Sequence, residues 1–112
     1  MTHPTQWIEI ARLDDIPRQG SRVVTFKDAR LALFRTVTDT VYALNDRCPH
    51  RGGRLSDGIV HGERVTCPLH GFKIDLASGE AVLPDTGCAH TWPVRVESGG
   101  VWLGQHEPHP EA

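Results

Sequence analysis

Cys48-Pro49-His50-Arg51-Gly52-Gly53 and Cys67-Pro68-Leu69-His70-Gly71 are the two stretches of this 112-residue chain that decide its fold. Each stretch offers one thiolate and one imidazole, and sixteen residues separate the first histidine from the second cysteine. Both stretches contain proline and glycine and follow expected strands, so we interpret them as loops that a rigid scaffold presents to a ligand. Thiolate sulfur and imidazole nitrogen are both ligands for transition metals. The candidate metal ligands are therefore Cys48, His50, Cys67 and His70.

The sequence on both sides of these loops predicts an all-β domain. Glycine (11 residues) and proline (8 residues) are spread as breaks between short runs of β-forming residues. No segment shows a long 3.6-residue periodicity, although Leu13–Pro17 could form one helical turn. The expected strands are Trp7–Ala11, Arg22–Phe26, Arg30–Thr36, Thr40–Leu44, Arg64–Thr66, Phe72–Asp75, Thr91–Glu97 and Val101–Leu103.

Composition and charge exclude several classes of protein. The formal net charge is −2 and no block of Lys and Arg occurs, so nucleic acid is not an expected partner. No stretch approaches the roughly 20 apolar residues that cross a bilayer, and the first residues lack the features of a signal peptide. We therefore expect a cytoplasmic protein with no membrane partner. Three cysteines in a reducing compartment favour metal binding over disulfides.

Two kinds of metal centre suit this set of ligands. A structural zinc site accepts two cysteines and two histidines, although zinc fingers usually group like ligands in pairs, whereas each pair here is mixed. The other possibility is a [2Fe–2S] cluster with cysteine on one iron and histidine on the other. Neutral imidazole in place of thiolate removes negative charge, which raises the reduction potential from about −400 mV to about −150 mV or above. The mixed pairs favour the iron–sulfur interpretation.

The two stretches and their spacing resemble the signature of the Rieske [2Fe–2S] family. The resemblance implies an antiparallel β-sandwich with a small cluster-binding subdomain over residues 7–104 and cluster loops at about 47–72. It also implies that Cys48 and Cys67 bind the inner iron and that His50 and His70 bind the outer iron. Residues 1–6 are then expected to be a flexible N-terminus and residues 105–112 a disordered tail.

Several positions depart from respiratory Rieske proteins. Gly53 and Leu69 stand where those proteins carry a disulfide between the cluster loops, and Phe72 and Ile74 stand where they carry serine and tyrosine. Fewer donors would then reach the cluster sulfurs, and such hydrogen bonds help to set the potential. We expect a low-potential centre, with Leu55, Leu69 and Phe72 shielding it from water.

Two systems use low-potential Rieske proteins of this size. The stretches Trp7–Pro17, Leu55–Val60 and Pro84–Val96 resemble the small subunit of assimilatory NAD(P)H nitrite reductase. That resemblance implies an electron-transfer subunit, inactive alone, whose large-subunit partner binds FAD, a [4Fe–4S] cluster and sirohaem and reduces nitrite to ammonium in nitrate assimilation. The alternative is a soluble Rieske ferredoxin that delivers electrons from a flavin reductase to an aromatic-ring dioxygenase.

Other residues have simpler expected roles. Cys88 is expected to be a buried or half-buried thiol with no redox function. Arg47, Arg51 and Arg54 surround the first loop, where they form either a solvated loop face or a rim that docks an acidic partner surface. No arrangement of nucleophile and base suggests catalysis by this chain.

Overall fold

The computed structural model describes residues 6–49, 53–68, 71–83 and 86–105, and these residues confirm the all-β prediction. No helix within these ranges is long and apolar enough to span a membrane. Two short 3-10 turns are present, η1 (Leu13–Asp15) and η2 (Leu55–Asp57). The strands are β1 (Gln6–Arg12), β2 (Gly20–Phe26), β3 (Ala29–Arg35), β4 (Val41–Asn45), β5 (Ile59–His61), β6 (Arg64–Thr66), β7 (Lys73–Asp75), β8 (Thr91–Trp92), β9 (Val94–Glu97) and β10 (Gly100–Gln105).

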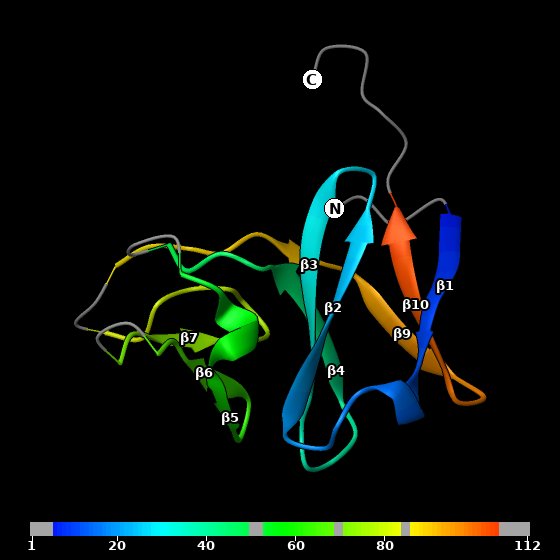
Figure 1. The fold of residues 1–112 in the computed structure, drawn as a ribbon, viewed down its shortest axis with the longest axis horizontal. Coiled ribbons are helices and arrows are strands. Elements are labelled where there is room, and N and C mark those ends of the chain that lie inside the picture. Colours follow the sequence, from blue (N-terminus) through cyan, green and yellow to red (C-terminus); the bar gives the residue numbers. More distant parts are fainter. Residues whose placement is uncertain (1–5, 50–52, 69–70, 84–85, 106–112) are drawn as a thin grey trace.

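The strands form three antiparallel sheets (Figure 1). A central sheet has the order β2-β3-β4-β8, and a second sheet has the order β1-β10-β9. The third sheet, β5-β6-β7, follows the first candidate loop in the chain, and it lies on the other side of the central sheet from β1-β10-β9 in Figure 1. This small sheet occupies the part of the chain in which the family resemblance predicts a cluster-binding subdomain.

Side chains of β3 alternate between two buried cores, because successive residues of a strand point to opposite faces of its sheet. Ala32 and Phe34 belong to the core shared with sheet β5-β6-β7, which also contains Val65. Leu31 and Leu33 belong to the other core, which contains side chains of β10. Strand β3 is therefore buried on both faces of the central sheet, and its side chains pack toward sheet β5-β6-β7 on one face and toward β10 on the other.

A two-residue turn joins β2 to β3. Phe26 pairs with Ala29, and the residues between them, Lys27 and Asp28, both have left-handed backbone angles, with φ of 47° and 67°. Two consecutive positive φ angles are typical of the hairpin turn whose twist matches that of the flanking strands. Neither residue is glycine, so the strand pairing on both sides maintains this conformation at a cost in backbone energy.

Most expected strands occur within one or two residues of their predicted bounds, and four differences stand out. The structure contains β5 and η2, which were not predicted. The single strand predicted over residues 91–97 is divided at Pro93, where the chain passes from the central sheet to the sheet of β10. Gln6 pairs with Gln105, so the β-structure extends one residue beyond the expected 7–104 domain at each end.

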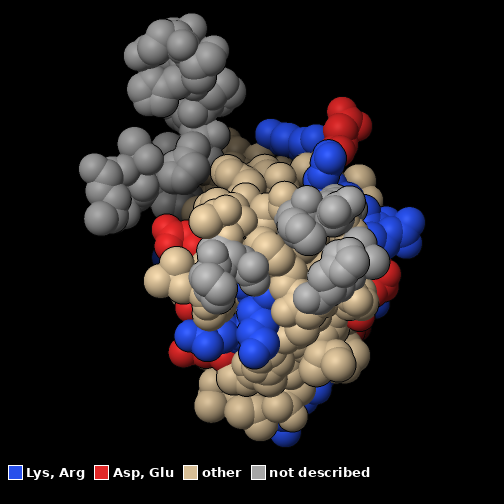
Figure 2. Space-filling view, turned by 90° about the vertical axis from the view of Figure 1, so that its left-hand side faces the viewer, with Lys and Arg blue, Asp and Glu red and all other residues tan. Residues whose placement is uncertain are grey.

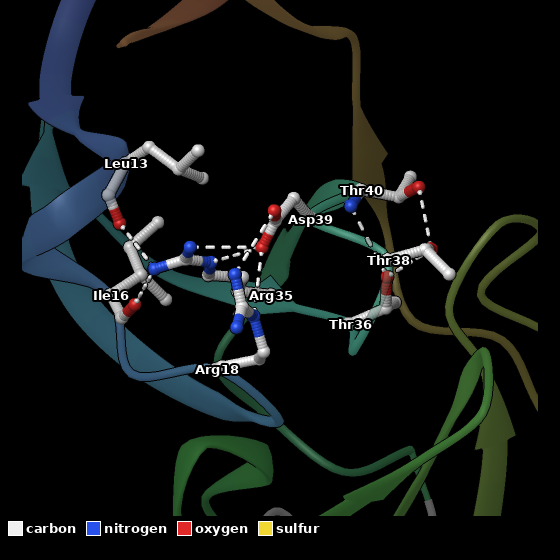
Figure 3. A network of polar contacts seen from close by, with 8 residues as sticks. All are labelled: Leu13, Ile16, Arg18, Arg35, Thr36, Thr38, Asp39 and Thr40. Atoms are coloured by element: carbon white, nitrogen blue, oxygen red, sulfur yellow. Dashed lines mark hydrogen bonds and ion pairs between the residues drawn. The ribbon is translucent and has the colours of Figure 1, made fainter.

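A charged network fastens η1 to the turn between β3 and β4 (Figure 3). The carboxylate of Asp39 accepts hydrogen bonds from Arg18 Nε at 3.1 Å and from Arg35 Nε at 2.9 Å. Arg35 also donates from Nη1 to the carbonyl oxygens of Leu13 and Ile16, at 3.1 and 2.9 Å. The two guanidinium groups stabilise the charged carboxylate and hold the pKa of Asp39 below its ordinary value of 3.8.

The lowered pKa predicts a pH-dependent contribution of Asp39 to stability. The contribution is fully present above the unfolded pKa near 3.8, and it is lost as the pH falls through the lower folded pKa. Asp39→Asn should therefore lower the free energy of unfolding at pH 7, while the difference from the unaltered protein should shrink in strong acid. Urea unfolding of both proteins across this pH range measures the effect, and a difference that is independent of pH would contradict it.

Candidate metal centre

Cys48 and Cys67 are buried in the same core. Their exposed fractions are 1% and 0%, and both belong to the cluster that contains Phe34 and Leu44 of the central sheet. Cys48 follows β4 and Cys67 follows β6, so the two thiols come from different sheets. The structure thus brings two of the four candidate ligands into one core, although eighteen residues of sequence separate them.

Both cysteines begin loops that are closed in the same way. The backbone N–H of Cys48 donates to the carbonyl of Gly53 at 2.6 Å, and that of Cys67 donates to the carbonyl of Phe72 at 2.7 Å. Each bond joins a residue to the fifth residue after it. The backbone at each cysteine is therefore held by the same kind of hydrogen bond where its loop begins.

A third segment, residues 86–90, lies against the first loop. Gly87 has a φ of 127°, and a Cβ atom at this position would lie 3.0 Å from Cβ of Pro49. Residue 87 therefore needs to be glycine for both its backbone angle and its close contact. The Gly87 carbonyl accepts a hydrogen bond from Ala81, and the Lys73 carbonyl accepts one from Val82, so this segment and β7 are connected.

The structure describes only some of the other residues predicted to form the site. His50 and His70 lie outside the described residues, as do Leu69 and Arg51, so their predicted roles stay predictions. Within the described ranges, no three His, Cys, Asp or Glu side chains gather as a metal site. Leu55 and Phe72 are buried, at 0% and 5% exposure, and both belong to the core that contains the two thiols. Their position agrees with the predicted shielding role.

The prediction that Cys88 is buried or half-buried was wrong, because this residue is exposed. The neighbouring Ala89 is 4% exposed and occupies the inward position of this extended segment. Since successive side chains of an extended segment point in opposite directions, Cys88 faces outward. Its thiol lies within 3.6 Å of the Ala89 carbonyl oxygen.

The surface around the loops carries few charges. Figure 2 views the end of the molecule that bears sheet β5-β6-β7, and most of the visible surface there is neither acidic nor basic. Basic side chains nevertheless reach this surface, and Arg47 and Arg54, which flank the first loop in the chain, are both exposed. Their exposure is compatible with either of the roles considered for them.

Comparison with known proteins identifies the family. The model of the Rieske [2Fe-2S] domain matches residues 6–93, and the chain belongs to this family. A Rieske domain implies a [2Fe–2S] cluster and electron transfer within an oxidoreductase system. The buried, paired cysteines fit such a cluster, because soft thiolate ligands suit iron–sulfur centres.

The relatives include ferredoxin components of dioxygenase systems and a nitrite reductase small subunit. The ferredoxin component of the naphthalene 1,2-dioxygenase/salicylate 5-hydroxylase systems of Ralstonia sp. is 37% identical over 87% of this chain and 93% of its own length. A crystal structure that carries the name of a nitrite reductase NADPH small subunit is 29% identical, with a TM-score of 0.78 over 88% of this chain and 97% of that chain. The complex of reduced oxygenase and oxidised ferredoxin in carbazole 1,9a-dioxygenase matches at 28% identity, with a TM-score of 0.77 over 92% of this chain and 96% of that chain.

One contact that the sequence does not reveal joins sheet β5-β6-β7 to the central sheet. Tyr42 of β4 donates a hydrogen bond from its hydroxyl to Oε1 of Glu63, which lies in the turn between β5 and β6. The hydrogen bond to a carboxylate stabilises the neutral phenol, and partial burial adds to this effect, so the pKa of Tyr42 rises to about 12. Tyrosine at the end of a strand next to a distant glutamate carries no sequence signal, because only the fold brings them together.

This contact predicts an unusual titration of the only tyrosine in the chain. Ultraviolet absorbance should report ionisation of Tyr42 near pH 12 in the folded protein. Glu63→Gln removes the carboxylate, so the pKa should fall toward the ordinary value of about 10. The unfolded protein supplies the reference, and equal titration midpoints in the two folded proteins would refute the role of Glu63.

Proposed function

We propose that this chain is a one-electron carrier whose cluster is bound by Cys48 and Cys67 at one iron and by His50 and His70 at the other. The observation that supports this proposal is the pair of buried thiols, each at the start of a loop closed by the same backbone hydrogen bond. The cluster would supply a centre that accepts and releases one electron at low potential.

The protein around the thiols supports such a role in two ways. Leu55 and Phe72 lie in the same buried core, so they keep water away from the inner side of the site. The two thiols also lie in the core shared with sheet β5-β6-β7, which occupies one end of the molecule (Figure 1). A centre at one end can approach the redox centre of a partner protein.

We further propose that the partner is the large subunit of an NAD(P)H nitrite reductase in the cytoplasm. The support is the match to the structure named as that enzyme's small subunit, together with the resemblance of residues 84–96. The described part of this stretch contacts the first loop, because Gly87 lies against Pro49. The stretch that most resembles the small subunit therefore adjoins the site from which electrons would leave. FAD, a [4Fe–4S] cluster and sirohaem would belong to the large subunit, and this chain would be inactive alone.

A specific observation favours a second function, that of a ferredoxin for an aromatic-ring dioxygenase. The Ralstonia ferredoxin component is 37% identical over 87% of this chain and 93% of its own length. In both functions the chain carries single electrons, and the two differ in the protein that receives them.

The ligand assignment predicts a specific pattern among cysteine variants. Cys48→Ser and Cys67→Ser should each abolish the electron paramagnetic resonance signal of the dithionite-reduced protein, because each removes a thiolate from the same iron. Cys88→Ser is the matched control and should leave the signal unchanged, since Cys88 is exposed.

His50→Cys or His70→Cys should lower the reduction potential of the cluster toward about −400 mV if the cluster assembles. Protein that contains zinc and no inorganic sulfide would support the structural zinc domain instead.

The choice of partner predicts different results in two reconstitution assays. If the chain is the nitrite reductase subunit, it should co-purify with a flavin- and sirohaem-containing subunit and should restore NAD(P)H-dependent reduction of nitrite to ammonium. If it is a ferredoxin, it should instead carry electrons from a flavin reductase to a Rieske oxygenase. Product formation in only the second assay would exclude the nitrite reductase proposal and leave the electron-carrier proposal intact.

A further inference from the structure

Asp46 lies two residues before Cys48 and has a completely buried side chain, with 0% of its surface exposed. Its carboxylate accepts three hydrogen bonds: from the backbone N–H of Ser56 at 2.7 Å, from the Ser56 hydroxyl at 2.7 Å and from Arg30 Nε at 2.9 Å. Burying a carboxylate is costly unless its partners replace the lost water. The three donors offset this cost, so the fold is specific for a carboxylate at position 46.

Asp46 and its partner Ser56 lie on opposite sides of the first loop in the chain. Asp46 precedes Cys48, and Ser56 follows Gly53 in the 3-10 turn η2, so the side-chain bonds lie just outside the backbone bond from Cys48 to Gly53. The first loop is thus closed twice, once by its backbone and once by a buried carboxylate.

The same carboxylate fixes the loop to the central sheet. Arg30 belongs to β3, and its carbonyl accepts a hydrogen bond from the backbone N–H of Asp46 at 2.9 Å. Ser21 of β2 donates from its hydroxyl to the Ser56 carbonyl at 2.8 Å. Both sides of the first loop are therefore attached to the β2–β3 hairpin, and Asp46 takes part in the attachment directly.

The second loop has a different support. There, Thr66 of β6 pairs with Lys73 of β7 directly beyond the bond from Cys67 to Phe72, so a β-ladder holds the base of the loop. The described residues on either side of the first loop, 46–49 and 53–54, form no such ladder, because β4 ends at Asn45 and η2 begins only at Leu55. The base of the first loop must therefore be held by a side chain, whereas paired strands hold the base of the second loop.

We propose that Asp46 is a positioning residue for the metal centre: its bonds to Ser56 and Arg30 replace the missing ladder and fix the position of the Cys48 thiol. This inference rests on the proposed ligation by Cys48. It explains how the first loop is held although Gly53 cannot contribute to a disulfide. Asp46 is not a ligand and acts only through the loop.

Two variants test the role of Asp46 in the cluster-loaded protein. Asp46→Asn puts an amide N–H₂ in place of one acceptor oxygen, so it should accelerate loss of the cluster to a chelator by about tenfold. The milder Ser56→Ala removes one hydrogen bond and should accelerate the loss by about fivefold. Both should also broaden or shift the electron paramagnetic resonance spectrum of the reduced protein, because the position of the Cys48 thiol becomes less uniform.

The matched control is Asp39→Asn, since Asp39 is a carboxylate that also bonds to arginines but takes no part in either candidate loop. This variant should reduce stability without changing cluster loss or the spectrum. Equal acceleration by Asp39→Asn would show a general effect of stability and would overturn the inference, as would unchanged cluster loss and spectrum in Ser56→Ala. If the unaltered protein holds sulfide and gives a Rieske signal, these failures leave the proposed function standing. Unaltered protein without sulfide would overturn both.

Discussion

Packing of the central sheet against Cys48 and Cys67 is the contact on which the site depends. Phe34 and Leu44 share a buried core with both thiols, and the same core contains Val65 and Ile74 of the small sheet. Apolar burial of this kind is the main favourable contribution to folding. The core brings two distant parts of the chain together, so the fold itself assembles the candidate site and the ligands need not be close in sequence.

Much of the architecture could be predicted from sequence because its signals are local. Short runs of β-forming residues between glycines and prolines predicted β1 to β4, and the two mixed Cys/His stretches predicted the loops and the family. The structure differs where the deciding contact is not local. Cys88 was expected to be buried because cysteine usually is, but Ala89 takes the inward position. Strand β5 has three residues and Ile59 is 72% exposed, so its apolar pattern was too short and too exposed to be recognised.

The polar contacts that support the site were even less visible in the sequence. Asp46 stands in a stretch typical of a turn, and nothing in its neighbours indicates that three donors surround it in the folded protein. Tyr42 and Glu63 likewise meet only because β4 passes the turn between β5 and β6. The two contacts join the same pair of units, the central sheet and the segment from Cys48 to β7. Sequence thus identifies the candidate ligands, whereas the residues that hold their loops in place emerge only from tertiary structure.

The tight turn at Lys27 and Asp28 has a consequence for the distant end of the molecule. Adjacent residues of β3 contribute to different cores, so a slip of one residue between β2 and β3 would exchange the two sets of side chains. Phe34 would then leave the thiols, and Arg30 would no longer face Asp46. The turn that joins β2 to β3 in the observed register therefore also determines which side chains of β3 reach a site that the turn itself does not contact.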